Sequence, residues 1–92
     1  MIRSFRHKGL QELFETGSTA RIDARFHGRL RVRLEAMRYA ESLEDLNQPG
    51  FNFHQLMGKP VRYTIHVNGP WCITFEWKEP FAERVDFENY HS

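Results

Sequence analysis

Hydrophobic residues in the first forty positions recur with helical spacing. Leu10, Leu13 and Phe14 lie at i, i+3 and i+4, and Gly17 follows where a helix would end. The same spacing continues over residues 18–40. Its hydrophobic members lie at steps of four, four, four and three: Ile22, Phe26, Leu30, Leu34 and Met37. The pattern predicts two amphipathic helices, each of which buries one stripe.

After residue 60 the period changes to two. Apolar and polar residues alternate over 61–67 and again over 71–77, with Asn68-Gly69 between the two runs. Because Asn and Gly both tolerate positive φ, this junction predicts a β-hairpin. A third alternating run, residues 84–88, follows a turn near Glu79-Pro80.

The remaining segments complete the expected fold. Residues 1–7 can form a short strand, and residues 41–60, broken by Pro and Gly, predict a loop with one helical turn near 43–46. The order strand, helix, helix, strand, strand, strand predicts a single α+β domain over residues 1–92. We expect a small antiparallel sheet with the two helices of the N-terminal half packed on its apolar face. The opposite face, the polar sheet face, would present Arg62, Thr64, His66, Cys72, Thr74, Glu76, Arg84, Asp86 and Glu88.

The formal net charge of +1 conceals an uneven distribution. Residues 1–40 carry nine Lys or Arg against four Asp or Glu, whereas residues 41–92 carry four against eight. Four arginines recur at steps of four beside the second helical stripe: Arg21, Arg25, Arg29 and Arg33. This arginine ridge favours RNA or ribosome binding, or contact with an acidic protein; a solvated helix flank is the alternative.

The compartment is indicated by what the chain lacks. One cysteine, Cys72, cannot form an intramolecular disulfide, which is typical of a reducing compartment. The N-terminal charges are not followed by an apolar run, so we expect no signal peptide. No apolar stretch is long enough to cross a bilayer, and we therefore expect a cytoplasmic protein with no membrane contact.

Three groups of residues occur in a characteristic order, at the start, at the hairpin and at the end of the chain. They are Ile2-Arg3-Ser4-Phe5 with Lys8-Gly9-Leu10 and Leu13-Phe14, then Val67-Asn68 with Trp71 and Ile73-Thr74-Phe75, then Phe87-Glu88-Asn89-Tyr90-His91. Together they resemble the HigB-type toxins of the RelE-like (RelE/ParE) superfamily over nearly the whole chain. The resemblance implies the RelE-like β-α-α-β-β-β fold.

The resemblance also implies an activity: cleavage of mRNA in the ribosomal A site, by attack of a 2′-hydroxyl on the neighbouring phosphate, without metal or cofactor. Such a reaction needs a base, an acid for the leaving oxygen and cations for the phosphorane. By position, the family's catalytic residues correspond to His54, Tyr90 and His91, with Lys59 and Arg62 as nearby cations. The implied partner is a helix-turn-helix, HigA-like antitoxin, with operator DNA contacted only through it.

Several site positions depart from the family pattern. Cys72 follows Trp71 where an arginine, a candidate for holding the scissile phosphate, is usual. Met57 replaces a lysine, Asn89 replaces an aspartate, and Lys59-Pro60-Val61-Arg62 replaces Asp-Arg-x-Gly. The alternative function is therefore a diverged, catalytically weak module that binds its antitoxin and helps to repress their operon. An RNA-binding protein unrelated to toxins is a third hypothesis.

Other candidate residues have two interpretations each. His54, His66 and His91 with Cys72 lack the close ligand spacing of a zinc site, so we expect no metal. Cys72 is either an activated nucleophile or an ordinary strand residue. His66 either contacts RNA or is solvated. The two tryptophans share the phase of Ile73, which predicts a place in the core rather than stacking on bases.

Overall fold

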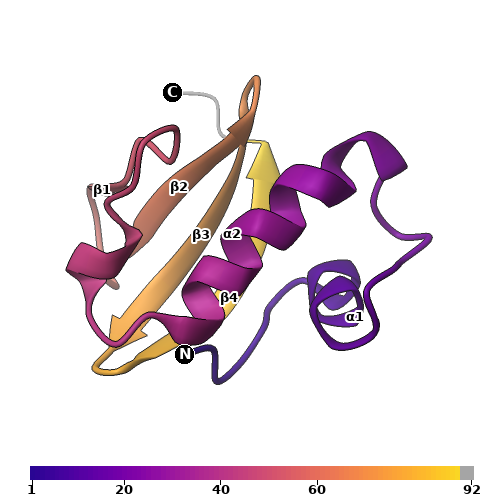
Figure 1. Cartoon of the computed structure of the whole chain (residues 1–92). Coiled ribbons are helices and arrows are strands. Elements are labelled where there is room, and N and C mark those ends of the chain that lie inside the picture. The colour runs from indigo at the N-terminus through magenta and orange to yellow at the C-terminus, as the bar shows by residue number, and fades with distance from the viewer. Residues whose placement is uncertain (90–92) are drawn as a thin grey trace.

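Two helices and a four-stranded sheet form two layers in the computed structural model, which describes residues 1–89 (Figure 1). The helices are α1 (Lys8–Thr16) and α2 (His27–Tyr39). The strands pair antiparallel in sequence order: β1 (His54–Gln55), β2 (Tyr63–Asn68), β3 (Trp71–Lys78) and β4 (Phe81–Asn89). Both helices lie on one face of the sheet, so the predicted α+β class is confirmed.

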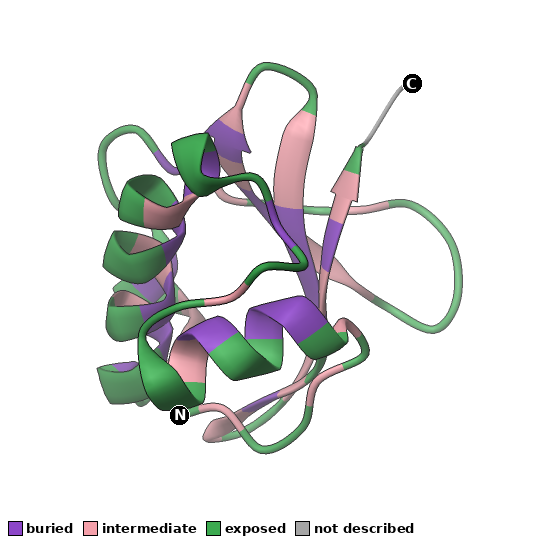
Figure 2. Ribbon diagram, turned by 90° about the vertical axis from the view of Figure 1, so that its right-hand side faces the viewer, coloured by how far each residue is buried: buried purple, intermediate pink, exposed green. Residues whose placement is uncertain are grey.

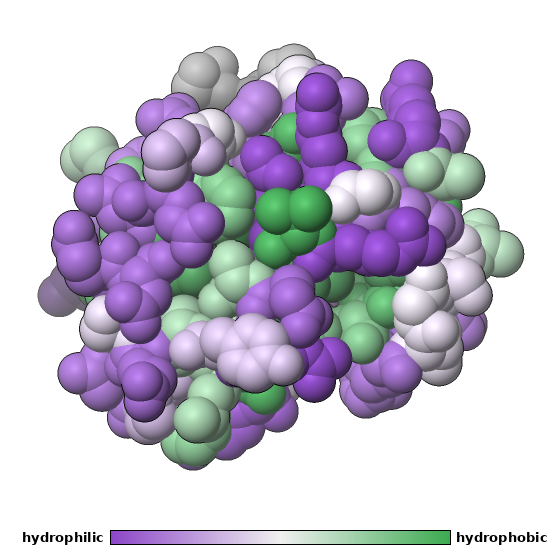
Figure 3. All heavy atoms as spheres, viewed as in Figure 1, coloured by the Kyte–Doolittle hydropathy of each residue, from purple (hydrophilic) through white to green (hydrophobic). Residues whose placement is uncertain are grey.

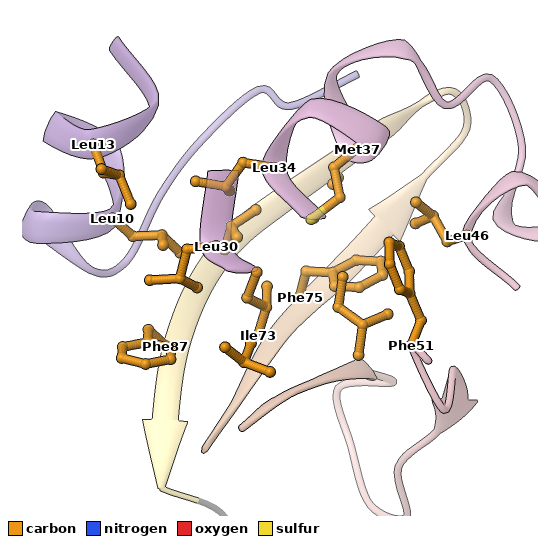
Figure 4. Close-up of a cluster of buried hydrophobic side chains, with 14 of the residues drawn as sticks. Leu10, Leu13, Leu30, Leu34, Met37, Leu46, Phe51, Ile73, Phe75 and Phe87 are labelled. Atoms are coloured by element: carbon orange, nitrogen blue, oxygen red, sulfur yellow. The ribbon is translucent and has the colours of Figure 1, made fainter. Parts of the chain in front are cut away.

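The core lies between the helices and the sheet. Buried positions of both layers face one another in Figure 2, and Figure 4 shows Leu10 beside Leu30, on the side of the sheet where Ile73 and Phe75 lie. All four of these side chains are fully buried. Trp71 packs against this core with its ring 4.8 Å from that of Phe87, which confirms its expected place.

The predicted hairpin is confirmed. Ile65 lies directly opposite Ile73 in the register of β2 and β3, and both are fully buried on the same face. The turn lies one residue later than the predicted Asn68-Gly69, because Asn68 still pairs with Trp71 as the last residue of β2. The turn residues are Gly69, whose φ of +56° is a conformation that glycine adopts at little cost, and Pro70. Each strand of the hairpin therefore presents its apolar set to the helices and its polar set to the opposite face.

The second helix is shorter than the predicted span of 18–40. The Thr19 hydroxyl accepts a hydrogen bond from the backbone N–H of Arg21, and the Asp23 carboxylate accepts one from Arg25, at 3.1 and 2.9 Å. These local bonds compete with helical ones, and α2 begins only at His27, after a 3₁₀ turn at Ala24–Phe26. The predicted end of α1 is confirmed, since Gly17 takes a left-handed conformation and its N–H bonds to the Leu13 carbonyl.

Two expectations about strands were wrong, one at the N-terminus and one in the loop 41–60. The N-terminal segment is not a strand but makes two isolated parallel bridges to β4, Ile2 with Ala82 and Phe5 with Val85. The loop 41–60 contains an unpredicted strand, β1, besides the expected helical turn at Leu43–Leu46. A two-residue strand shows no periodicity, so only its pairing partner reveals it. None of the helices in residues 1–89 has the length and apolar character needed to cross a membrane.

Candidate functional site

Strand register gathers the polar side chains into rows on the face opposite the helices. Directly paired residues of antiparallel strands point to the same side. One row runs His54, Thr64, Thr74 and Asp86 across the four strands; the next runs His66, Cys72 and Glu88. The polar sheet face is therefore built as predicted, although Thr64 and Thr74 are buried within it rather than exposed.

Arg62 is the most firmly held cation on the polar sheet face. Its guanidinium donates to Glu76 Oε2 at 3.1 Å, to Thr74 Oγ1 at 3.1 Å and to the Arg84 carbonyl at 3.0 Å, and only 12% of the side chain is exposed. Burial lowers the pKa of Arg62 most, and Arg6 lowers it further, while Glu76 and Glu88 oppose both effects. Thr74 extends this hydrogen-bond network to β4, because its hydroxyl donates to the carboxylate of Glu88. Arg62 is thus a fixed positive charge in the floor of this face.

A β-bulge brings a second arginine to the same place. Thr74 pairs with Asp86 but Glu76 pairs with Glu83, so β4 holds one residue more than β3 in this interval. Arg84 lies in the bulge with a φ of +51°, and its N–H bonds to the Ser4 hydroxyl at 2.9 Å. Its Nε lies 3.1 Å from Glu76 Oε2. The sequence signal for this bulge was the polar pair 83–84, which breaks the strict alternation of β4.

The N-terminal segment adds two more arginines that sequence reasoning missed as site residues. Arg3 pairs with Glu83, and Arg6 lies 3.6 Å from Asp86 Oδ2. These contacts follow from the two bridges to β4, which place residues 1–6 beside a strand eighty positions away. No local pattern encodes that proximity.

His54 stands at the β1 edge of the polar sheet face, in an exposed position. Its Nδ1 lies 2.8 Å from the Asn52 carbonyl oxygen. Because a carbonyl only accepts hydrogen bonds, Nδ1 is the donor in this contact, and in the corresponding neutral tautomer Nε2 carries the lone pair. Arg62 lies two residues before Thr64, the partner of His54, which makes it the diagonal neighbour of His54. The Arg62 guanidinium, however, reaches toward β3 and β4, away from His54 on β1.

Of the other predicted catalytic residues, the structure describes only Lys59. Lys59 lies in the exposed loop that precedes β2. Tyr90 and His91 lie outside the described residues, and β4, which leads to them, is separated from β1 by two strands. Strands are spaced by about 4.8 Å, so β1 and β4 lie roughly 14 Å apart across the sheet. The convergence of Tyr90 and His91 with His54 stays a prediction.

His66 and Cys72 are paired neighbours on the polar sheet face. The His66 ring is tied to the hairpin through Nε2, 3.0 Å from the Gly69 carbonyl oxygen. The Cys72 thiol is half-buried and lies 3.9 Å from the Pro70 carbonyl oxygen. Within residues 1–89, no group of three His, Cys, Asp or Glu side chains lies close enough together to hold a metal ion.

The arginine ridge is not continuous. Arg21 precedes α2, Arg25 lies in the 3₁₀ turn, and only Arg29 and Arg33 are on the helix. Arg33 is turned inward: it donates to the carbonyls of His66, Arg29 and Gly50 at 2.6, 3.2 and 3.3 Å. Burial, and secondarily Arg29, lower the pKa of Arg33. The predicted ridge was therefore wrong as a single surface, although the outer face around α2 is largely hydrophilic (Figure 3).

Arg33 should contribute to stability. Arg33→Ala leaves the carbonyls of His66 and Gly50 without their charged donor, and we expect the free energy of unfolding to fall by about 2–3 kcal/mol. Arg29→Ala, an exposed helix position, is the matched control and should change it by less than about 0.5 kcal/mol. Urea denaturation measures both. Equal effects of the two substitutions would contradict the structural role of Arg33.

Comparison with known proteins identifies the family. A family model described as the RelE-like toxin of the type II toxin–antitoxin system HigB matches residues 3–91. The chain belongs to this family of HigB-like toxins. It is also 38% identical to an endoribonuclease HigB of Proteus vulgaris, over 92 residues that cover 99% of this chain and all of the relative. The resemblance predicted from the three residue groups is therefore confirmed.

In this HigB-like toxin the residue groups that carry the resemblance meet in space. The opening segment lies against β4 through the bridges of Ile2 and Phe5. The hairpin group forms the end of β2 and the first part of β3, which pairs with β4. The closing group begins at Phe87, opposite Ile73. The family pattern thus describes one packed unit that supports the polar sheet face.

Proposed function

We propose that this HigB-like toxin is a ribosome-dependent mRNA endoribonuclease. The observation that carries the proposal is the match to an endoribonuclease HigB that covers nearly all of this chain and all of the relative. The polar sheet face supports it, since this face carries both a histidine, His54, and a firmly held arginine, Arg62. A base and a cation are two of the three groups that cleavage of a phosphodiester by its own 2′-hydroxyl needs, the third being an acid for the leaving oxygen.

The proposed reaction needs no metal. The 2′-hydroxyl of the bound nucleotide loses its proton to His54 Nε2 and forms a bond to phosphorus. The bond from phosphorus to the 5′-oxygen breaks, and that oxygen takes a proton from His91 or Tyr90. Arg62 and Lys59 balance the charge of the phosphorane. The products are a 2′,3′-cyclic phosphate and a free 5′-hydroxyl.

The proposed partners follow from the family. A helix-turn-helix antitoxin would bind and neutralise the toxin in the cytoplasm, and operator DNA would be reached only through that antitoxin. The alternative, a catalytically weak module that serves mainly in operon repression, is favoured by one observation. Arg62 already directs its donors to Glu76, Thr74 and the Arg84 carbonyl, and position 72 offers a thiol in place of a cation.

The decisive experiment is cleavage of mRNA in a reconstituted translation reaction. Purified toxin is added to ribosomes paused on a defined message, and the cut sites are mapped by primer extension. Cuts within the A-site codon that disappear without ribosomes are expected. Absence of cuts with ribosomes, combined with tight antitoxin binding, would support the weak module instead.

The exposed members of the arginine ridge should bind RNA phosphates. We expect Arg25→Ala/Arg29→Ala to weaken ribosome binding and to reduce the log–log salt slope by about 0.7–0.9 for each phosphate that the variant no longer neutralises. A salt titration of ribosome binding measures the slope. Arg38→Ala, an exposed arginine at the other end of α2, is the control. Identical slopes for wild type and the double variant would show that these arginines are only solvated.

A further inference from the structure

Glu76 holds an unusual position on the polar sheet face, because one of its oxygens lies between two guanidinium groups. Oε2 is 3.1 Å from an NH group of Arg62 and 3.1 Å from Nε of Arg84. Carboxylate and phosphate oxygens are equivalent ligands for arginine, which binds both through charge-assisted hydrogen bonds. The carboxylate therefore stands where an oxygen of a phosphodiester would bind.

The two arginines are held differently. Arg62 is fixed by three acceptors and is 12% exposed, whereas the Arg84 side chain is 60% exposed and extends from the bulge. Because the Arg84 end of this ion pair is exposed to solvent, its contact with Glu76 is more strongly screened than that of the enclosed Arg62, and Arg84 can turn to another anion. The pair thus combines an enclosed arginine with one that reaches solvent, which suits capture of a ligand from solvent.

The neighbouring charges leave Glu76 as the shared counter-ion of this pair. Glu83, its partner across the strands, is engaged by Arg3, and Asp86 is approached by Arg6. Displacement of the Glu76 carboxylate would leave two positive charges facing one gap. An anion that enters there replaces the displaced negative charge.

We propose that Arg62 and Arg84 form a binding site for an RNA phosphodiester, and that Glu76 occupies this site in the free protein. The inference rests on the proposed function only for the identity of the anion. It adds Arg84 as a phosphate-binding residue and Glu76 as an internal competitor that weakens RNA binding off the ribosome. Glu76 lies on β3, one row along from that of His54 and two strands across from β1 on the same face of the sheet.

The test measures binding without cleavage. The probe is a 2′-O-methyl trinucleotide, which carries phosphodiesters but no attacking hydroxyl, and its affinity is determined by calorimetry or NMR titration. Glu76→Gln keeps the side-chain shape and removes the competing charge, so we expect about tenfold tighter binding, the effect of one charged hydrogen bond that the ligand need not displace. Arg84→Ala in the Glu76→Gln background should abolish that gain.

Glu83→Gln is the matched control. Glu83 faces Glu76 directly, is equally buried and also pairs with an arginine, so it reports the general effect of removing one negative charge. We expect its affinity to change by less than about twofold. Equal gains in both variants, or no gain in Glu76→Gln, would overturn the site. Arg84→Ala in the wild-type background retains the Arg62–Glu76 pair and should weaken binding; unchanged affinity there would also overturn it.

This binding experiment separates the two proposals. Tight binding by Glu76→Gln in a protein that never cuts mRNA would keep the phosphate site and reject the nuclease function. Cleavage on the ribosome, combined with no effect of Glu76→Gln on trinucleotide affinity, would do the reverse. Melting curves of each variant confirm that the sheet is folded under the conditions of the titration.

Discussion

His54→Ala is expected to lower ribosome-dependent mRNA cleavage by about 10²–10⁴-fold, the range typical of losing a general base. The Asn52 carbonyl favours the neutral tautomer with its proton on Nδ1, in which Nε2 can accept the proton of the 2′-hydroxyl. Because His54 is exposed at the sheet edge, the substitution should leave the free energy of unfolding nearly unchanged. Single-turnover cleavage on paused ribosomes measures the rate.

Gln55→Ala is the control for this loss. Gln55 is also exposed and shares β1, but it pairs with Tyr63 and so points to the opposite side of the strand. Its cleavage rate should match that of the wild type. A His54→Ala protein that cuts at the wild-type rate would remove His54 from the mechanism and leave the protons to His91 or Tyr90.

Much of the fold was encoded in local patterns. The hairpin at Gly69, the cap at Gly17 and the stripe of α2 all follow from periods and turn residues that span less than one element. The start of α2 did not, because Ile22 and Phe26 keep helical spacing while Asp23 caps a 3₁₀ turn between them. Hydrophobic spacing reports burial, and the hydrogen bonds of polar side chains decide the backbone.

The candidate site was predictable only in part for a related reason. Alternation placed Glu76 and Arg84 on the polar sheet face, but their contact depends on a one-residue shift between β3 and β4. The contributions of Arg3 and Arg6 depend on parallel bridges to a segment eighty residues away. Such long-range pairings leave no trace in a local period. The sequence therefore indicates which groups face one side, whereas the register determines which of them meet.

Cys72→Arg should raise cleavage, by up to about 10²–10³-fold if one missing electrostatic interaction with the phosphorane limits the wild-type rate. Position 72 is half-buried on the polar sheet face, opposite His66 on β2 and Glu88 on β4. An arginine there extends from the row next to that of Thr74, whose hydroxyl accepts a hydrogen bond from Arg62. Cys72→Gln adds length and hydrogen-bonding capacity without charge, and this control should not raise the rate.

The carboxylate of Glu88 determines how much of that gain is realised. Glu88 already accepts a hydrogen bond from the Thr74 hydroxyl and lies directly across the strands from position 72. Its carboxylate would therefore compete with the RNA phosphate for a new guanidinium at position 72. We therefore expect Cys72→Arg/Glu88→Gln to cut faster than Cys72→Arg alone. If neither protein exceeds the wild-type rate while His54→Ala abolishes cleavage, Arg62 and Lys59 already supply the charge that the usual arginine provides. If the wild type is inactive and both variants remain so, the thiol at position 72 is not the defect, and the weak-module function gains support.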